Sequence, residues 1–197
     1  MGRPKNYDRD DALVAARDLF WERGYEATSI SDLEERTGLN RSSLYQEFGS
    51  KHDLFEAALE CYADRVIAQL LADLRGHDAR LDTVAGLFTR LAELFSSRTA
   101  VATQGCLMVN TTAELAARDE RIRPAAMKYR DHLRASFKSA LAKAAKNGEI
   151  DEGTVAPRAK LLTSTLMGVW LAVRIDPNDA SSLCRTIADE VNSWRKL

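Results

Sequence analysis

The sequence contains little cysteine, and the pattern of its cysteines excludes two common roles. The three cysteines, Cys61, Cys106 and Cys184, are an odd number without a CxxC spacing. No histidine lies at a ligand-like interval from them, so neither a disulfide framework nor a zinc site is indicated. We therefore expect no metal, no cofactor and a chain that resides in a reducing cytoplasm.

Long apolar runs are also missing. The longest, from Leu166 to Val173, is much shorter than the roughly 18 residues that indicate a membrane span. The opening Met-Gly-Arg-Pro-Lys lacks the apolar stretch of a signal peptide. A hydrophobic share of 45% with 29% charged residues is typical of a soluble globular protein, so we expect no membrane partner.

Net charge is nearly absent. The formal charge is -1, and residues 1–52 carry eight Lys and Arg against ten Asp and Glu. This balance argues against a nonspecific binder of nucleic acid. Any contact with DNA must therefore come from the local placement of basic and polar side chains.

Signatures of enzymes and of β-structure are absent as well. The three histidines, His52, His77 and His132, have no metal-binding spacing, and there is no P-loop, Gly-rich dinucleotide turn or nucleophile elbow. No stretch of the sequence both alternates apolar with polar residues and is rich in β-branched residues, so no β-strand is predicted. We expect an all-α protein that is not an enzyme.

Helical patterns are what the sequence does contain. In the first 50 residues, apolar spacing, caps and terminating glycines predict three helices: residues 9–23, a short helix from Thr28 or Ser29 to Gly38, and Arg41 to Phe48. The last two, joined by a tight glycine turn, form a helix-turn-helix. Its expected core is Leu13, Leu19, Phe20, Ile30, Leu33, Leu39, Leu44 and Phe48. Further helices are expected at about 51–74, 81–97, 105–117, 124–146, 155–174 and 178–195.

A helix-turn-helix reads DNA through the exposed start of its second helix. Here Arg41 can pair with guanine and Gln46 with adenine, although either could instead touch phosphate. Tyr45 could also serve packing alone. The other groups expected at phosphates, or allowing close approach to the groove, are Thr28, Ser29, Ser42, Ser43, Tyr45 and Lys51, with Arg3 and Lys5 on an N-terminal arm.

These residues form a recognisable pattern. It reads Gly24-Tyr25-x-x-Thr28-Ser29-Ile30-x-Asp32-Leu33, then Thr37-Gly38-x-Asn40-x-x-Ser43-Leu44-Tyr45-x-x-Phe48-Gly49-x-Lys51. Over about residues 7–56 the chain resembles the N-terminal domain of the TetR family of bacterial repressors. The resemblance implies a homodimer on a roughly palindromic operator in double-stranded DNA, released when a small-molecule inducer binds the C-terminal helices. Glu34 departs from the family, which often has a small residue there.

The fold expected from both arguments has two parts. Residues 1–50 form a three-helix helix-turn-helix DNA-binding domain, and residues 51–197 form a larger helical ligand-binding and dimerisation domain. The runner-up is an activator or a ligand-independent regulator, which would use the same DNA-binding residues. A pure interaction bundle would explain the C-terminal helices but leave the pattern from Ser42 to Lys51 without a purpose.

Candidates for an inducer pocket are apolar and aromatic residues of the central helices. A lining rich in Met and aromatic side chains suits a hydrophobic ligand, although each residue could equally be plain core. The set is Phe88, Leu91, Met108, Met127 and Trp170.

Cys106 is a separate candidate for sensing. It is expected in the first turn of a helix, where the helix dipole can lower the pKa of a thiol. The segment Gly105-Cys106-Leu107 also resembles one in TetR-like regulators that sense electrophiles or oxidants. The competing interpretation is a small buried hydrophobe.

The last two helices are expected to pair the subunits, because in the family such helices form a four-helix bundle about a two-fold axis. Leu161 and Thr165 lie on the first of these helices and Trp194 on the second, and Ser164 and Gly168 would allow close approach. The predicted interface residues are Leu162, Leu166, Val169 and Val173 on one helix and Leu183, Ile187 and Val191 on the other.

Overall fold

The computed structural model describes residues 7–196, apart from the side chain of Ala100. Helices and the turns between them account for these residues, which confirms the all-α prediction. The elements are α1 (Arg9–Arg23), α2 (Ile30–Thr37), α3 (Arg41–Phe48), α4 (Lys51–Tyr62), the π-helix η1 (Ala63–Ile67), α5 (Ala68–Leu70), α6 (Ala72–Arg75), α7 (Leu81–Ser96), α8 (Ala100–Thr103), α9 (Leu107–Leu115), α10 (Ile122–Lys146), the 3-10 helix η2 (Glu152–Thr154), α11 (Val155–Ala172) and α12 (Pro177–Ser193).

Side-chain caps fix where the N-terminal helices begin. Ser29 and Ser50 each form a capping box, with Asp32 and Asp53 respectively, so that two backbone N–H groups at each helix start are satisfied. The turn between α2 and α3 depends on Gly38, whose φ of 70° lies in the left-handed region that other residues rarely adopt. This turn places α3 across α2, as a helix-turn-helix requires.

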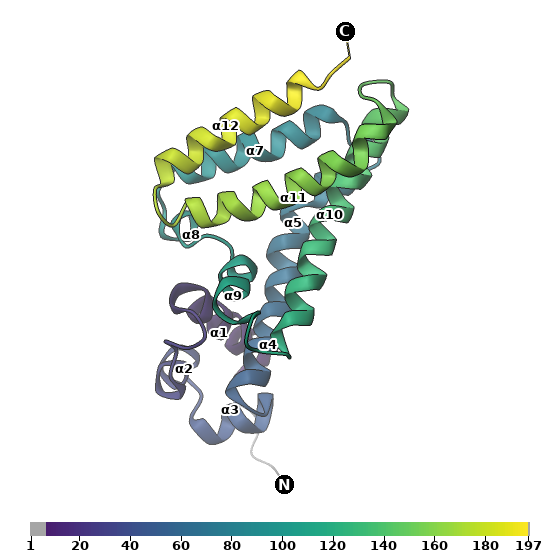
Figure 1. Ribbon diagram of the computed structural model, residues 1–197. Helices are drawn as coiled ribbons and strands as arrows, with labels where there is room; N and C mark the ends of the chain where they lie inside the picture. Colours follow the sequence, from purple (N-terminus) through teal and green to yellow (C-terminus); the bar gives the residue numbers. More distant parts are fainter. Residues whose placement is uncertain (1–6, 197) are drawn as a thin grey trace.

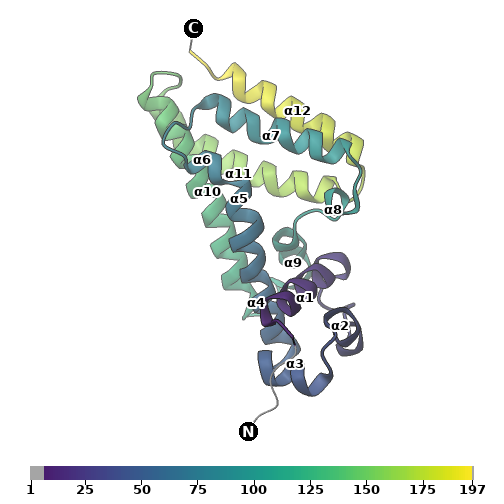
Figure 2. The same ribbon diagram turned by 180° about the vertical axis from the view of Figure 1, so that it is seen from behind.

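The helices form two groups at opposite ends of the molecule, and long helices connect the two groups (Figure 1). Helices α1, α2 and α3 gather at one end, and α7, α11 and α12 lie side by side at the other. The long α10 and the run from α4 to α5 connect the two, and Figure 2 gives the same arrangement from behind. The C-terminal helix α12 packs chiefly against α7.

The sequence predicts one continuous helix from residue 51 to about 74, whereas the structure divides this region into several helical segments. It widens into the π-helix Ala63–Ile67 and is interrupted at Leu71, after which α6 begins. The short α8 was not expected. The π-helix and α6 begin without a side-chain cap, whereas at the start of α8 the Thr99 hydroxyl accepts the Ala102 backbone N–H at 3.3 Å.

Most of the predicted helix-turn-helix core is buried, and Phe20, Leu33 and Leu44 are almost inaccessible. Leu13 and Ile30 lie only half-buried at its margin. No helix among residues 7–196 combines the length and the apolar character needed to cross a lipid bilayer. The same residues contain no group of three or more His, Cys, Asp or Glu arranged to hold a metal ion.

Candidate nucleic-acid interface and sensing region

The helix α3 presents a polar outer face from its first residue. Its cap is Asn40, whose side-chain oxygen accepts the Ser43 backbone N–H at 2.9 Å. Leu44 and Phe48 are buried on the inner side. The exposed residues of the helix are Arg41, Ser42, Tyr45 and Gln46, with Ser43 half-buried behind them. Four of the predicted DNA-reading side chains therefore reach solvent from one short helix.

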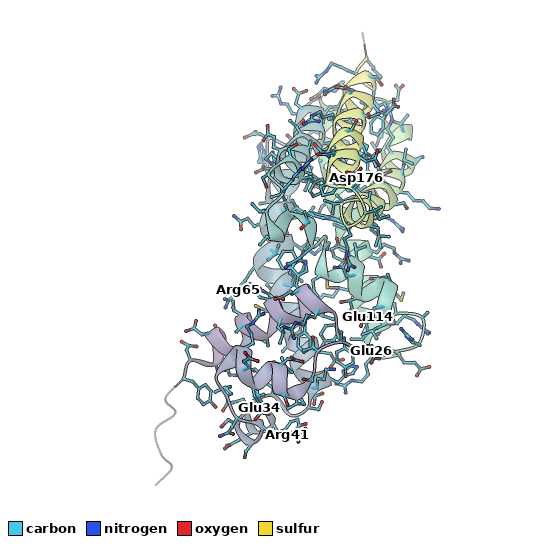
Figure 3. The ribbon with its side chains drawn as sticks, turned by 90° about the vertical axis from the view of Figure 1, so that its left-hand side faces the viewer. Glu26, Glu34, Arg41, Arg65, Glu114 and Asp176 are labelled. Carbon is cyan, nitrogen blue, oxygen red and sulfur yellow. The ribbon has the colours of Figure 1, made fainter. Side chains whose placement is uncertain are left out.

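Glu34 joins α2 to the start of α3. Its carboxylate accepts the Arg41 backbone N–H at 2.6 Å, and Figure 3 places the two residues together. The first N–H groups of a helix have no partner within it, so an acceptor here stabilises α3. The departure from the family pattern thus has a structural role, which the sequence did not indicate. It also places a negative charge where a phosphate would otherwise find a free N–H.

Of the two predicted phosphate donors before α2, only Ser29 is exposed. Thr28 is fully buried, and its hydroxyl donates to the Gly24 carbonyl oxygen at 2.6 Å. The prediction that Thr28 faces DNA is therefore wrong, because a buried hydroxyl with its proton already donated cannot reach a phosphate. The Ser29 hydroxyl lies 2.5 Å from the Asp32 carboxylate.

Lys51 lies half-buried at the start of α4. Its ammonium group is 4.2 Å from the centre of the Tyr25 ring, a cation–π contact. Burial lowers the pKa of the Lys51 ammonium below its ordinary value. A phosphate that binds Lys51 competes with this contact. The predicted arm residues Arg3 and Lys5 lie outside the described residues.

A carboxylate from α9 reaches across to the turn after α1. The Glu114 side chain accepts the backbone N–H of Tyr25 at 3.2 Å and that of Glu26 at 2.8 Å. Figure 3 shows Glu114 and Glu26 side by side. This contact ties the helix-turn-helix end to the helix that carries Cys106 at its start.

A second link runs through Gly105. The Trp21 indole N–H donates to the Gly105 carbonyl oxygen at 3.1 Å. Gly105 has a φ of 76°, and a Cβ atom at this position would lie 2.7 Å from the Trp170 carbonyl oxygen of α11. Gly105 therefore contacts α1 on one side and α11 on the other, and only glycine fits between them.

The turn before α10 forms a third link, with α4. The Asp119 carboxylate lies 2.8 Å from His52 Nε2 and also accepts the N–H groups at the start of α10, which lowers the pKa of Asp119. Arg121 bridges Asp53 and Glu56 at 2.5 Å each. Hydrogen bonds from Arg121 and then Ser50 lower the pKa of Asp53 from 3.8 to about 2.

Cys106 occupies the N-cap position of α9 and is completely buried. Its sulfur lies 3.4 Å from the Tyr129 hydroxyl, and the Tyr62 hydroxyl also hydrogen bonds to it. Burial raises the pKa of the Cys106 thiol, while the two tyrosine hydrogen bonds oppose that rise. The prediction of a pKa lowered by the helix dipole is therefore wrong, because loss of solvent outweighs the dipole.

Four of the five predicted pocket residues lie in the core. Phe88 stacks on Phe137 with ring centres 6.2 Å apart, and Trp170 meets Phe95 edge to face at 5.3 Å. Leu91 and Met108 are buried among them. Met127 is 49% exposed on α10, so it does not belong to an interior lining. The buried Trp170 indole N–H has no hydrogen-bond partner among the described residues.

Most of the predicted interface residues point into the core of the single chain and not toward a second subunit. Six of the seven are buried within the single chain: Leu162, Leu166, Val169, Val173, Ile187 and Val191. They are unavailable to a second subunit because they pack on the protomer's own helices, and only Leu183 is exposed, at 38%. The outward stripe of α11 consists of Leu161, Ser164 and Gly168, which the sequence also places in the pairing region, and of Leu171 and, just beyond the helix, Ile175. That of α12 consists of Ser182, Leu183 and Thr186.

Comparison with known proteins gives matches along most of the chain. Residues 12–58 match the family described as "Bacterial regulatory proteins, tetR family", and residues 79–188 match "Tetracyclin repressor-like, C-terminal domain". Among curated proteins, the chain is 44% identical over 115 residues to the transcriptional repressor ComR of Escherichia coli K12. That match covers 58% of this chain and only 54% of ComR.

Two further relatives align along nearly their whole length. The uncharacterised transcriptional regulator YezE of Bacillus subtilis 168 is 25% identical over 177 residues, which cover 89% of this chain and 90% of YezE. A solved structure of the TetR family regulator CifR, a cysteine mutant in complex with 26-base-pair operator DNA, is 25% identical with a TM-score of 0.79. It covers 99% of this chain and 100% of that one.

Proposed function

This chain belongs to the TetR family of bacterial transcriptional regulators, and from that membership we propose that it is a repressor that a small-molecule or electrophilic inducer releases from a palindromic operator. The chain is a DNA-binding regulator, and its curated relatives are transcriptional regulators, not enzymes. We accordingly expect no catalytic activity. An activator or ligand-independent regulator with the same helix-turn-helix is the second candidate.

The observation that carries the proposal is the solvent-facing start of α3. Arg41 and Gln46 have the donors and acceptors that pair with guanine and adenine edges in a major groove. Ser29, Ser42, Ser43, Tyr45 and Lys51 are assigned to phosphates or to close backbone approach. Because Thr28 is buried, it is not among them.

We propose the helix-turn-helix domain as residues 1–50 and the ligand-binding and dimerisation domain as residues 51–197. One chain carries one recognition helix, and a palindromic site has two halves, so useful affinity requires a homodimer. The proposed pairing surface is the outward stripe of α11 and α12. It mixes large apolar residues, such as Leu161 and Leu183, with the small Gly168. A Cβ at Gly168 would meet nothing within 4 Å, so packing within one chain does not require glycine there.

An inducer that enters the core among Phe88, Leu91, Met108 and Trp170 must displace packed side chains. The unpartnered Trp170 N–H would gain an acceptor from such a ligand. Movement of α9 would then act on the turn after α1 through Glu114. This route offers a physical connection between ligand and DNA affinity.

An electrophilic inducer would act at Cys106. The thiol sulfur adds to an electrophilic carbon, forming an S–C bond, while the thiol proton passes to the adduct. Tyr62 and Tyr129 can stabilise the transient thiolate by donating hydrogen bonds. The adduct would need space that the completely buried site lacks, so α9 would have to move.

The test of the proposed function is binding to selected DNA. Fragments of the source genome retained by the protein are identified, and one is compared with a scrambled duplex by fluorescence anisotropy at two salt concentrations. We expect a protected palindrome, bound about a thousandfold or more tightly than the scrambled duplex. Equal affinity for both duplexes would refute the proposal. Reporter expression from the protected promoter then separates repressor from activator.

A further inference from the structure

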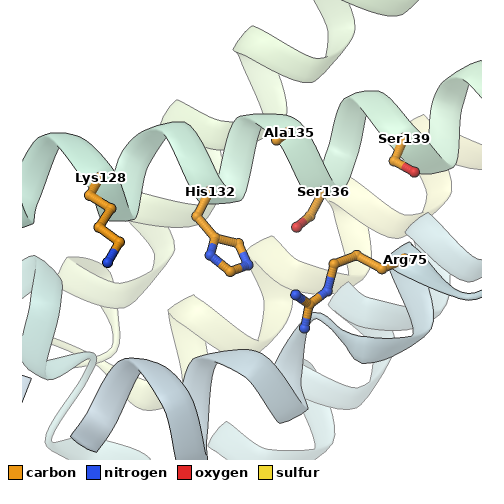
Figure 4. Close-up of a pocket in the computed structure, with 6 residues that line it drawn as sticks. All are labelled: Arg75, Lys128, His132, Ala135, Ser136 and Ser139. Carbon is orange, nitrogen blue, oxygen red and sulfur yellow. The ribbon is translucent and has the colours of Figure 1, made fainter. Parts of the chain in front are cut away.

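A groove on the outer side of α10 gathers three basic side chains. It has a volume of about 600 Å³ and is lined by Arg75 at the end of α6 and by Lys128, His132, Ala135, Ser136 and Ser139 of α10. No carboxylate belongs to this lining. In Figure 4 the Arg75 guanidinium, the His132 ring and the Ser136 hydroxyl point into the same space.

The Ser136 hydroxyl is an independent sign of a missing ligand. Ser136 is 2% exposed, and its Oγ has no hydrogen-bond partner among the described residues. A serine inside a helix commonly donates to the carbonyl four residues earlier, which Ser136 does not do. A buried hydroxyl without a partner costs free energy, so a ligand atom that fills this role is favoured.

Other contacts hold Arg75 in position. Its guanidinium donates to the Ala68 carbonyl oxygen at 3.0 Å. Lys143 of α10 donates to the carbonyl oxygens of Arg75 and Gly76 at 3.1 and 2.6 Å, which fixes the end of α6 against α10. The charge of Arg75 is therefore oriented before any ligand arrives, which reduces the entropy lost on binding.

Within the described residues, neither Lys128 nor His132 forms an ion pair. The Lys128 side chain makes no hydrogen bond or ion pair within residues 7–196. Burial, together with the charges of Arg75 and Lys128, lowers the pKa of His132 below its ordinary value. Unpaired positive charges that repel one another are stabilised by a shared anion.

We propose that this groove binds a small anionic molecule, whose carboxylate or phosphate group lies among Arg75, Lys128 and the Ser136 hydroxyl. The volume leaves space for an organic body beyond the anionic group. The site lies outside the apolar core proposed for the inducer, and its existence does not depend on the repressor proposal. If both proposals hold, the anion is a second effector of the regulator.

The test uses the full-length protein without DNA, so its outcome is independent of the proposed function. Inorganic phosphate and, separately, benzoate are titrated at constant ionic strength while NMR follows the ring signals of His52, His77 and His132. Phosphate and benzoate distinguish the two kinds of anionic group. We expect a saturable shift of the His132 signal alone, assigned with His132→Gln.

The variants Lys128→Gln and Arg75→Gln should each weaken the anion's affinity about tenfold or more, since each removes a charge-assisted hydrogen bond. Lys138→Gln is the matched control, because Lys138 is an exposed lysine of the same helix that lines a different groove. Lys128→Gln should leave the thermal midpoint unchanged because Lys128 makes no internal bond. No His132 shift with either anion, or an unchanged titration in Lys128→Gln, would overturn the proposal.

Discussion

The Cys106 thiol combines deep burial with two tyrosine hydroxyls. Burial raises the pKa of Cys184 to about 12 although the positive charge of Arg185 opposes the rise, and no tyrosine hydrogen bond lowers it. We therefore predict that iodoacetamide modifies Cys106 faster than Cys184 in the native protein, and both far more slowly than in urea. Tyr129→Phe should slow the Cys106 reaction, by about tenfold for each unit its pKa rises.

Mass spectrometry of tryptic peptides at successive times measures these rates, and Tyr25→Phe controls for loss of a tyrosine elsewhere. If Cys106 reacts no faster than Cys184, and a Cys106→Ser protein still responds to every inducer, the electrophilic mechanism fails.

The Arg121 guanidinium controls the acid behaviour of Asp53. Since the folded pKa of Asp53 is about 2 against an ordinary 3.8, its ionised form adds stability above about pH 4. That contribution is lost as the pH falls from about 4 through 2. Arg121→Gln should raise the pKa of Asp53 and move acid unfolding to higher pH, as followed by circular dichroism.

Arg130→Gln is the control for that change, because within residues 7–196 the Arg130 guanidinium makes hydrogen bonds only to the neighbouring Asp131 carboxylate. Identical acid midpoints for the Arg121→Gln protein and the unmodified chain would contradict the assignment of the shift to Arg121.

The exposed face of α3 is proposed to make two kinds of DNA contact, one to base edges and one to phosphates. Arg41→Ala or Gln46→Ala should weaken operator binding and remove about 1–3 kcal/mol of discrimination at one base pair, if they read base edges. Tyr45→Ala should weaken binding to all sequences alike, since phosphates carry no sequence information. Competition with a set of single-base operator variants measures both effects.

Glu60→Ala, an exposed change on α4, provides the control. If the Arg41→Ala and Gln46→Ala proteins both discriminate among the operator variants as well as the unmodified protein does, these two residues contact phosphates and not base edges.

The bounds of α1 to α3 could be predicted from the sequence because local signals determine them. Asp8, Ser29 and Asn40 begin the helices, and glycines end them. The tie from Glu34 to Arg41 could not be predicted, since it depends on the angle between two helices. Thr28 and Ser29 looked equivalent in sequence, and only the three-dimensional turn determines which is buried.

The register of α11 was harder to predict because the helix has two apolar sides. The more uniformly apolar side, which includes Leu162, Leu166 and Val169, is the chain's own core. The side that mixes leucines with serine and glycine is exposed. The sequence places residues of both sides in the pairing region, because a single sequence does not reveal whether a leucine packs on its own chain or on another copy.

The subunit arrangement gives a further prediction. Leu183→Asp places a charge on the proposed pairing surface and should yield folded single chains with much weaker operator binding, because an unpaired buried carboxylate is costly. Analytical ultracentrifugation measures the mass. By contrast, Val169→Asp should unfold the protein, since Val169 is completely buried.

Met127→Asp is the matched control, an exposed apolar residue of α10 outside the pairing surface. It should leave the dimer intact. If the Leu183→Asp protein and the Leu161→Asp protein both remain dimeric, the pairing surface lies elsewhere.

The position of Gly105 has a consequence for the evolution of such a regulator. A methyl group there would collide with the Trp170 carbonyl oxygen, while the carbonyl of the same residue holds Trp21. If the proposed inducer acts by moving α9, mutation of Gly105 to alanine would imitate that movement without altering the exposed residues of α3 or of the proposed pairing surface. On that proposal, adding a single carbon atom in the interior would leave the target promoter insensitive to the inducer.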